Sequence, residues 1–392
     1  MAHALIEFAA ADFAAGPATA APIGSDTGYG LGWDHARHGL VPPAAHLHAG
    51  NPLRAGWQAG KSAFGRRTLA PTPRVRQWLQ LRLGAWLRGL AFDTLQVTPH
   101  YLGQIGVRHC PVTRREIGPV AASGIDEARI ERVCADAGFA AGNLAMLGAS
   151  AAVAADRVRH DWRLALKNAE QIEADPAHAT LDGLDAAAWR RLAVLLSFTT
   201  ALAHDEAARL PLHLLPPNRL RLLNPVQGLQ VLLTLRLARA GWGAAIRALA
   251  EKMPGEAHRA EFSRFVAALV PRLLEVSTAM ASATGSRATN PAIEDAWSNP
   301  LVQARWQRFA LTLTEAQAQT LLQHAAALAP AGQQLQLLDR EQATEGWALA
   351  SCGRARPGSA TERWPATTAS ARSAWRPAGD RGAAALTLAT LQ

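Results

Sequence analysis

The stretch that decides the fold of this chain is Glu131–Asn143, with the sequence ERVCADAGFAAGN, which follows His109–Thr113, HCPVT. Around these pieces, residues 99–168 have the mixed character of a compact αβ segment, whereas residues 169–350 show an almost purely helical pattern. We therefore expect a mainly α protein, with a multi-helix domain and one small αβ segment.

The remaining parts of the chain differ from these two in composition. Residues 1–98 combine an arm rich in Gly, Pro and Ala, expected to be irregular up to about residue 73, with a basic amphipathic helix that starts after Pro73. Within the helical region, we expect helices that include residues 186–210 and 225–251. Residues 351–392 are rich in Ala, Ser, Thr and Pro, carry few large apolar side chains and are expected to form a disordered tail.

Bulk composition limits where the protein works. The chain has 392 residues, a formal net charge of +9 and three cysteines, Cys110, Cys134 and Cys352. So few cysteines argue against a disulfide framework and favour a reducing compartment. No apolar run reaches the ~18 residues that a membrane span needs. We therefore expect a cytoplasmic protein with no membrane partner.

Several short pieces of the αβ segment resemble, in order and spacing, the phage-type HNH endonuclease family. They are Cys110–Thr113, Glu131–Val133, Gly138–Phe139, Gly142–Asn143 and Ala151. In that family, a Cys-Pro-aliphatic segment precedes an Asp-Arg-Ile-Asp strand, a Gly-Tyr turn, a Gly-Asn-Val strand and a helix that opens with Arg-Ala-Asn. The resemblance covers about residues 105–166. It implies a ββα-metal fold, in which a hairpin and a helix hold Mg²⁺ or Mn²⁺ against the scissile phosphate.

The resemblance assigns roles to only a few residues. Glu131 stands at the position of the family's first Asp, and Asn143 at its Asn, so these two would be the surviving metal or phosphate contacts. His109 is then the candidate base. Cys134 stands where the second acid belongs, and a thiol is a poor ligand for Mg²⁺, while Ala152 replaces the metal-binding Asn of the helix. We therefore expect a degenerate core that is weakly active or inactive in cleavage.

Positive charge gathers between Arg54 and Arg115. This stretch contains eleven cations and a single anion, Asp93. Such an excess attracts polyanions, so the sequence predicts a surface for nucleic acid, with DNA as the first candidate. The expected contacts are Arg66, Arg67, Arg74, Arg76, Arg82, Arg88, Arg108, Arg114, Arg115 and Arg132. Four aromatic residues between the charges, Trp57, Phe64, Trp78 and Trp86, could stack on bases. For Trp78 and Trp86, burial in the core face of one helix is the alternative.

Four histidines near the N-terminus form a second candidate metal site. His35, His38, His46 and His48 lie close to Asp34, and imidazoles with one carboxylate at such spacings can bind a transition ion. The alternative is that these are solvated loop histidines, because Gly and Pro surround them. Zinc is not expected in the αβ segment, because no Cys-x₂₋₄-Cys pair exists there.

Three functions remain open at this point. The first is a nucleic-acid-binding protein with a degenerate HNH-like core. The second is a helical scaffold that binds a protein partner and retains the αβ segment as a relic. The third is a metal-dependent HNH endonuclease.

Overall fold

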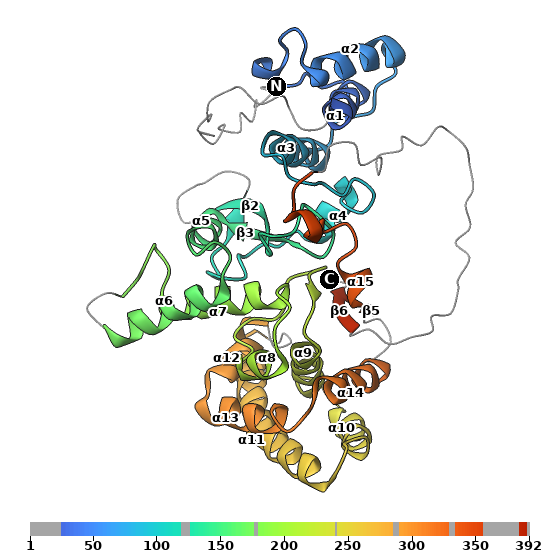
Figure 1. Ribbon diagram of the computed structural model, residues 1–392. Coiled ribbons are helices and arrows are strands. Elements are labelled where there is room, and N and C mark those ends of the chain that lie inside the picture. The colour runs from blue at the N-terminus through green and yellow to red at the C-terminus, as the bar shows by residue number, and fades with distance from the viewer. Residues whose placement is uncertain are drawn as a thin grey trace.

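The computed structural model describes residues 25–118, 126–175, 179–239, 241–284, 290–328, 334–355 and 384–389. The chain is mainly helical, as predicted, and its parts follow one another along the molecule (Figure 1). Helices α1–α3 form one end, the αβ segment lies in the middle, and the helical region forms the other end. Within the described residues, no helix is long and apolar enough to cross a bilayer.

The prediction of an irregular N-terminal arm is wrong from Ser25 onward. Helices α1 (Ser25–Arg37) and α2 (Pro52–Phe64), with the short η1 (Ala44–His46) between them, pack closely against each other. A Cβ atom added to Gly56 would lie 1.8 Å from the carbonyl oxygen of Tyr29, and one on Gly32 would lie 2.0 Å from that of Leu53. The glycines therefore allow two helix backbones to touch. They do not mark turns. The first 24 residues lie outside the described part.

Helix α3 (Pro73–Leu87) begins after Pro73, as predicted, because Thr72 caps it and Pro73 occupies its first turn. The Thr72 hydroxyl accepts a hydrogen bond from the Val75 N–H. Trp86 is buried against α1, and the indole N–H of the half-buried Trp78 donates to the Val97 carbonyl. The core interpretation of these two tryptophans is thus confirmed. The short helix α4 (Pro99–Gln104) follows.

The αβ segment contains a hairpin followed directly by a helix. Strands β1 (Ile117–Gly118) and β2 (Asp126–Arg132) are parallel, and β2 pairs antiparallel with β3 (Leu144–Gly148). Helix α5 (Ala149–Arg157) starts where β3 ends and packs on the hairpin, with small buried side chains such as Ala151 and Ala154 at the contact. The strand–strand–helix order of residues 126–157 matches the expected layout.

Nine α-helices lie between Trp162 and Ala327 among the described residues. They are α6 (Trp162–Ala174), α7 (Ala186–Phe198), α8 (His204–Arg209), α9 (Pro225–Leu237), α10 (Trp242–Glu251), α11 (Glu256–Thr284), α12 (Asn290–Asp295), α13 (Pro300–Ala310) and α14 (Glu315–Ala327), with the 3₁₀ turn η2 (Ala296–Ser298) between α12 and α13. Two predicted helices are each divided. The side chain of Asn224 bonds the Leu202 N–H and the Thr200 carbonyl, which fixes a break between α7 and α8. The left-handed Gly241 separates α9 from α10.

A second sheet joins distant parts of the chain. Its strand order is β4 (Arg221–Leu222), β6 (Ala384–Ala389), β5 (Gln334–Asp339), with both pairings antiparallel. The prediction of a disordered tail is therefore wrong for residues 384–389. Residues 356–383 and 390–392 lie outside the described part. After β5 come α15 (Arg340–Ala343) and η3 (Leu349–Ser351).

The chain after α15 binds back onto the αβ segment and the end of α3. The Gly138 N–H donates to the Trp347 carbonyl at 2.7 Å, and the Ala91 N–H donates to the Gly353 carbonyl at 2.8 Å. The Phe139 N–H in turn donates to the Ala91 carbonyl. Three segments, residues 89–93, 134–143 and 347–355, are thus tied together by backbone hydrogen bonds; we call this arrangement the three-segment clamp.

Candidate functional site

Asn143 lies inside the protein and is fully occupied by hydrogen bonds. Its side chain is 0% exposed. The Oδ1 atom accepts from the Cys134 N–H at 2.8 Å, and Nδ2 donates to the carbonyls of Cys134 at 3.2 Å and Gly138 at 3.0 Å. The predictions that Asn143 contacts metal or phosphate therefore conflict with the structure, because the amide is used to hold the β2–β3 loop.

The β2–β3 loop itself is enclosed by neighbouring parts of the chain. The Gly142 N–H donates to the phenol oxygen of Tyr101, and the Trp347 indole donates to the Ala141 carbonyl. A Cβ atom on Gly142, whose φ is +85°, would lie 2.3 Å from the Arg221 side chain. Residues 137–143 are all buried, so this part of the loop offers no open face to a phosphate.

Glu131 instead faces the end of α5. It lies on the same face of the hairpin as its partner Ala145, which packs in the core with Ala151 of α5. Burial and the nearby charge of Asp156 raise the pKa of Glu131 above its ordinary value, against the opposing influence of Arg88 and His160. Asp156, near the end of α5, and His160, just after it, thus both influence the charge of Glu131. We call these three residues the hairpin–helix cluster.

The ring of His160 is held between two acceptors. Its Nδ1 atom lies 3.1 Å from the Val133 carbonyl oxygen and its Nε2 atom lies 3.2 Å from Oδ1 of Asp156. The hydrogen bond from His160 lowers the pKa of Asp156. As placed, His160 orients Asp156 and has no free nitrogen with which to take a proton from water.

The positive charges of two arginines, Arg88 and Arg132, also act on the hairpin–helix cluster. Arg132 donates to the carbonyls of Ala135 and Ala137 at 2.6 and 2.8 Å, and its guanidinium carbon lies 5.5 Å from the centre of the Phe139 ring. Burial lowers the pKa of Arg132, and the positive charge of Arg88 adds to this effect. Arg132 is therefore a structural residue in this protein, and its assignment as a nucleic-acid contact is corrected. Arg88 is exposed and stays a candidate.

His109, the predicted base, lies away from Glu131. It forms a β-bridge with Glu116, whose carbonyl accepts from the Asp126 N–H at the beginning of β2. Glu131 is five residues further along this strand, a separation of roughly 16 Å at the usual rise per residue. The structure thus does not bring His109, Glu131 and Asn143 together.

The predicted metal ligands do not converge either. Within the described residues, no group of three or more His, Cys, Asp or Glu side chains could hold a metal ion. His35 is buried and donates from Nδ1 to the Leu31 carbonyl, and burial lowers its pKa. Burial also lowers the pKa values of His38 and His46, while His48 bonds the side chain of Asn51. His35 therefore belongs to the packing of helix α1.

Several predicted nucleic-acid contacts have structural partners. Arg82 is 6% exposed and pairs with Asp34 at 2.5 Å, so its assignment to a binding surface is wrong. Arg114 pairs with Glu294 at 3.1 Å and Asp295 at 2.8 Å, which joins the αβ segment to the helical region. Arg108 forms an exposed pair with Glu116. These arginines are partly or wholly neutralised by carboxylates.

Four other arginines remain exposed at the junction of α2 and α3. They are Arg66, Arg67, Arg74 and Arg76, and we call them the basic edge. No ion pair within 4.0 Å joins any of them to a carboxylate among the described residues, and the stretch from residue 51 to residue 92 contains no Asp or Glu. Arg115 is also exposed, but it lies in the turn before β1. The basic edge is therefore a group of predicted contacts whose charges are not paired with carboxylates in the described structure.

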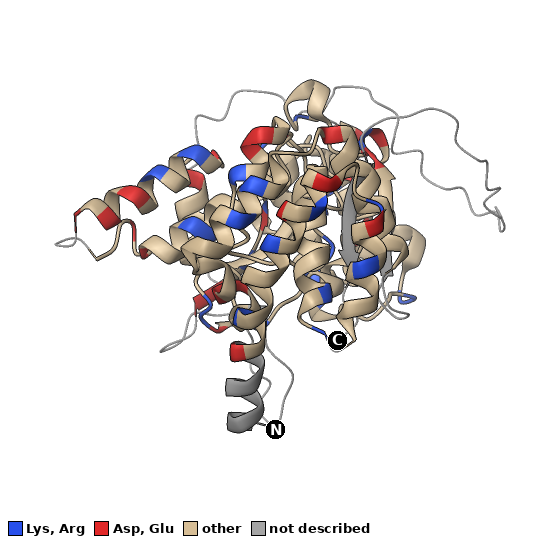
Figure 2. Cartoon of the chain, turned by 90° about the horizontal axis from the view of Figure 1, so that it is seen from below, with Lys and Arg blue, Asp and Glu red and all other residues tan. Residues whose placement is uncertain are grey.

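The helical region differs from the basic edge in its charge pattern. In Figure 2, positions of Lys or Arg (blue) and of Asp or Glu (red) alternate along its helices. Pairs one helical turn apart, such as Arg209 with Asp205 and Arg272 with Glu275, neutralise each other. The formal charge excess of the chain is thus concentrated near the N-terminal helices.

Sequence reasoning missed two features. Asp156 and His160 are four residues apart, the spacing of neighbours on one helical face, and this could have indicated that they meet. A cavity between α6, α7, α8 and α13 also went unpredicted, because its residues come from four separated segments.

Comparison with models of protein families, with curated proteins and with solved structures gave no match to this chain. The function is therefore argued from the geometry alone.

Proposed function

We propose that the protein binds nucleic acid, with duplex DNA as the first substrate to test, through the basic edge. The observation that carries this proposal is the set of four exposed guanidinium groups at the α2–α3 junction without a carboxylate within 4.0 Å in the described structure. Unpaired arginines gain most from phosphate, since they have no internal ion pair to break.

The proposed binder cleaves weakly or not at all. Asn143 is used to hold its own loop, and both ring nitrogens of His160 face acceptors. Water activation needs a free base, and metal catalysis needs several convergent oxygen or nitrogen ligands. The hairpin and α5 then serve as the structural link between the basic edge and the helical region.

The test is the salt dependence of binding to a short DNA duplex, measured by fluorescence anisotropy. The variant R66A/R67A/R76A should bind more weakly and should reduce the slope of log K against log salt by about 2 to 3, because each lost phosphate contact contributes about 0.9. The matched control is R264A/R272A/R308A, which removes the same charge from exposed positions of the helical region. It should leave the slope unchanged.

Two outcomes would favour the other functions. If neither the wild type nor the control binds DNA at low salt, the helical scaffold that binds a protein partner replaces this proposal. The hairpin–helix cluster is the one observation that favours an endonuclease. Nicking of a supercoiled plasmid with Mg²⁺ or Mn²⁺ that is lost in E131A and H160A would support cleavage there. The proposal expects no such nicking.

A further inference from the structure

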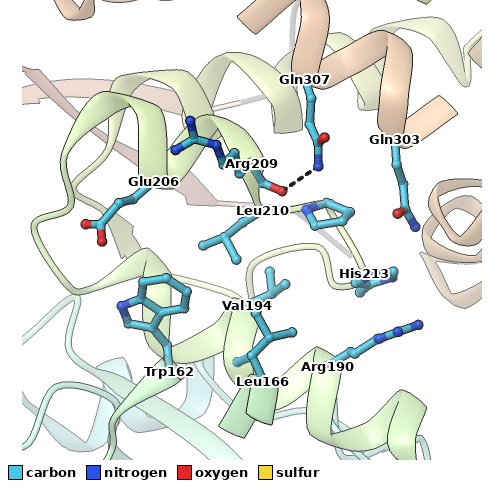
Figure 3. Close-up of a pocket in the computed structure, with 12 residues that line it drawn as sticks. Trp162, Leu166, Arg190, Val194, Glu206, Arg209, Leu210, His213, Gln303 and Gln307 are labelled. Carbon is cyan, nitrogen blue, oxygen red and sulfur yellow. Dashed lines mark hydrogen bonds between the residues drawn. The ribbon is translucent and has the colours of Figure 1, made fainter. Parts of the chain in front are cut away.

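A cavity of about 360 Å³ opens in the helical region between α6, α7, α8, the segment after α8, and α13 (Figure 3). Its volume is in the range of sites that hold small organic molecules. The nucleic-acid proposal does not use it, because the basic edge lies at the other end of the molecule (Figure 1).

One side of the cavity is apolar. Trp162 and Leu166 of α6, Val194 of α7 and Leu210 after α8 line it together. In Figure 3 these four side chains lie next to one another. Burying an apolar ligand body against them would be favourable, because it removes apolar surface from water.

The opposite side carries positive charge. His213 and Arg190 lie beside each other there (Figure 3). Burial lowers the pKa of His213 to about 4, and the charges of Arg190, Arg191 and Arg114 act in the same direction, while Asp295 opposes them. The imidazole is therefore neutral at pH 7 and lies in a positive field.

The carboxylate on the rim is already engaged. Glu206 accepts from Arg163 at 2.5 Å, and the Gln307 amide donates to the Arg209 carbonyl at 2.9 Å. The Gln303 amide donates to the Trp297 carbonyl at 2.8 Å. These bonds hold the rim in place. The guanidinium of Arg190 is itself paired with Glu173 of α6.

We propose that this cavity binds a small monocarboxylate with an apolar body, its carboxylate between His213 and Arg190 and its body against Trp162, Leu166 and Val194. An anion at this position would accept from the N–H groups of Arg190 that its ion pair with Glu173 leaves over. It also favours the protonated form of His213, so binding takes up a proton from solution.

The first experiment is isothermal titration calorimetry on the full chain at about pH 5.5 with 3-phenylpropionate and its neutral analogue 3-phenylpropan-1-ol. We expect the carboxylate to bind at least about tenfold more tightly, a difference of about 1.4 kcal/mol. Repeating the titration in two buffers of different ionisation enthalpy should show net proton uptake with the carboxylate and none with the alcohol. Equal affinities, or no binding of either probe to the folded chain, would refute the proposal.

Two variants locate the site. R190Q should weaken 3-phenylpropionate binding about tenfold and leave the alcohol unaffected. L166W should fill the apolar side and abolish binding of both probes. The control R308Q changes an exposed cation of α13 that does not line the cavity, and it should bind like the wild type. Wild-type affinity in both R190Q and L166W, with their fold verified by circular dichroism, would place the ligand elsewhere and overturn the assignment.

Discussion

Glu131 is the residue whose role changes most between sequence and structure. By position it is a metal ligand, but in the folded chain it is a largely buried carboxylate beside a second one, Asp156. Burial and like charge both oppose its ionisation. The ionised side chain therefore lowers the stability of the folded state at neutral pH. Packing alone does not require a carboxylate at this position.

E131Q should stabilise the protein at pH 7 by about 1 kcal/mol. The folded-state pKa of Glu131 is raised above its unfolded value, so the folded state binds this proton more tightly. Its unfavourable contribution thus appears as pH rises above the unfolded pKa and is complete once pH passes the folded pKa. Urea unfolding of wild type and E131Q should give equal free energies near pH 3 and diverge toward pH 7. Equal stabilities across this range would show that the carboxylate is solvated.

At the residue scale, the sequence predicted positions better than roles. The spacing from Glu131 to Ala151 correctly indicated a hairpin and a helix, because glycine turns and strand lengths are local properties. The role that the resemblance implied for Asn143 conflicts with the structure, since the partners of the amide depend on how the loop closes. Arg82 was assigned to solvent because its partner Asp34 is 48 residues away.

At the element scale, the contact between α1 and α2 shows why composition misled. Gly28, Gly32, Gly56 and Gly60 raise the glycine content to that of a loop, but they recur every four residues and so share one face of each helix. Glycine lowers helix propensity, and close packing of the backbones compensates for it. The period of the glycines, more than their number, carried the structural information.

Gly56→Ala should destabilise the protein by about 3 kcal/mol, because its Cβ atom would overlap the Tyr29 carbonyl of the facing helix and force the pair apart. Gly84→Ala is the matched control inside helix α3. Outside the helix backbone, the nearest atom to its Cβ would belong to the flexible Arg88 guanidinium, 3.7 Å away, so alanine should be neutral or stabilising by up to about 1 kcal/mol. Thermal unfolding of both variants measures the difference. Similar melting temperatures would mean that α1 and α2 can separate freely.

At the scale of the whole molecule, long-range contacts determine which predicted parts become accessible. The three-segment clamp uses residues from three widely separated parts of the sequence, and β6 completes a sheet with strands far from it in the chain. Local patterns contain no signal for such pairings. This is why the enclosed state of the β2–β3 loop and the order of residues 384–389 were not predicted, although the mainly helical class was.

Trp347 is the side chain on which the three-segment clamp depends most. It is 0% exposed, and its indole N–H donates to the Ala141 carbonyl while its own carbonyl accepts from Gly138. Trp347→Ala should cost about 3–5 kcal/mol, because a large cavity opens and a buried acceptor loses its donor. Leu349→Ala, at a side chain 43% exposed two residues away, should stay within about 0.5 kcal/mol of the wild type.

Hydrogen exchange separates loss of the clamp from general weakening of the fold. In Trp347→Ala, the Gly138 and Phe139 amides, which donate to Trp347 and Ala91, should exchange much faster, because opening of the clamp exposes the β2–β3 loop. Amides of α9, whose side chains pack in a separate part of the core, should keep their protection. If the α9 amides exchange faster by the same factor as those of Gly138 and Phe139, the chain unfolds as one unit. The three-segment clamp would then not open independently of the rest of the core.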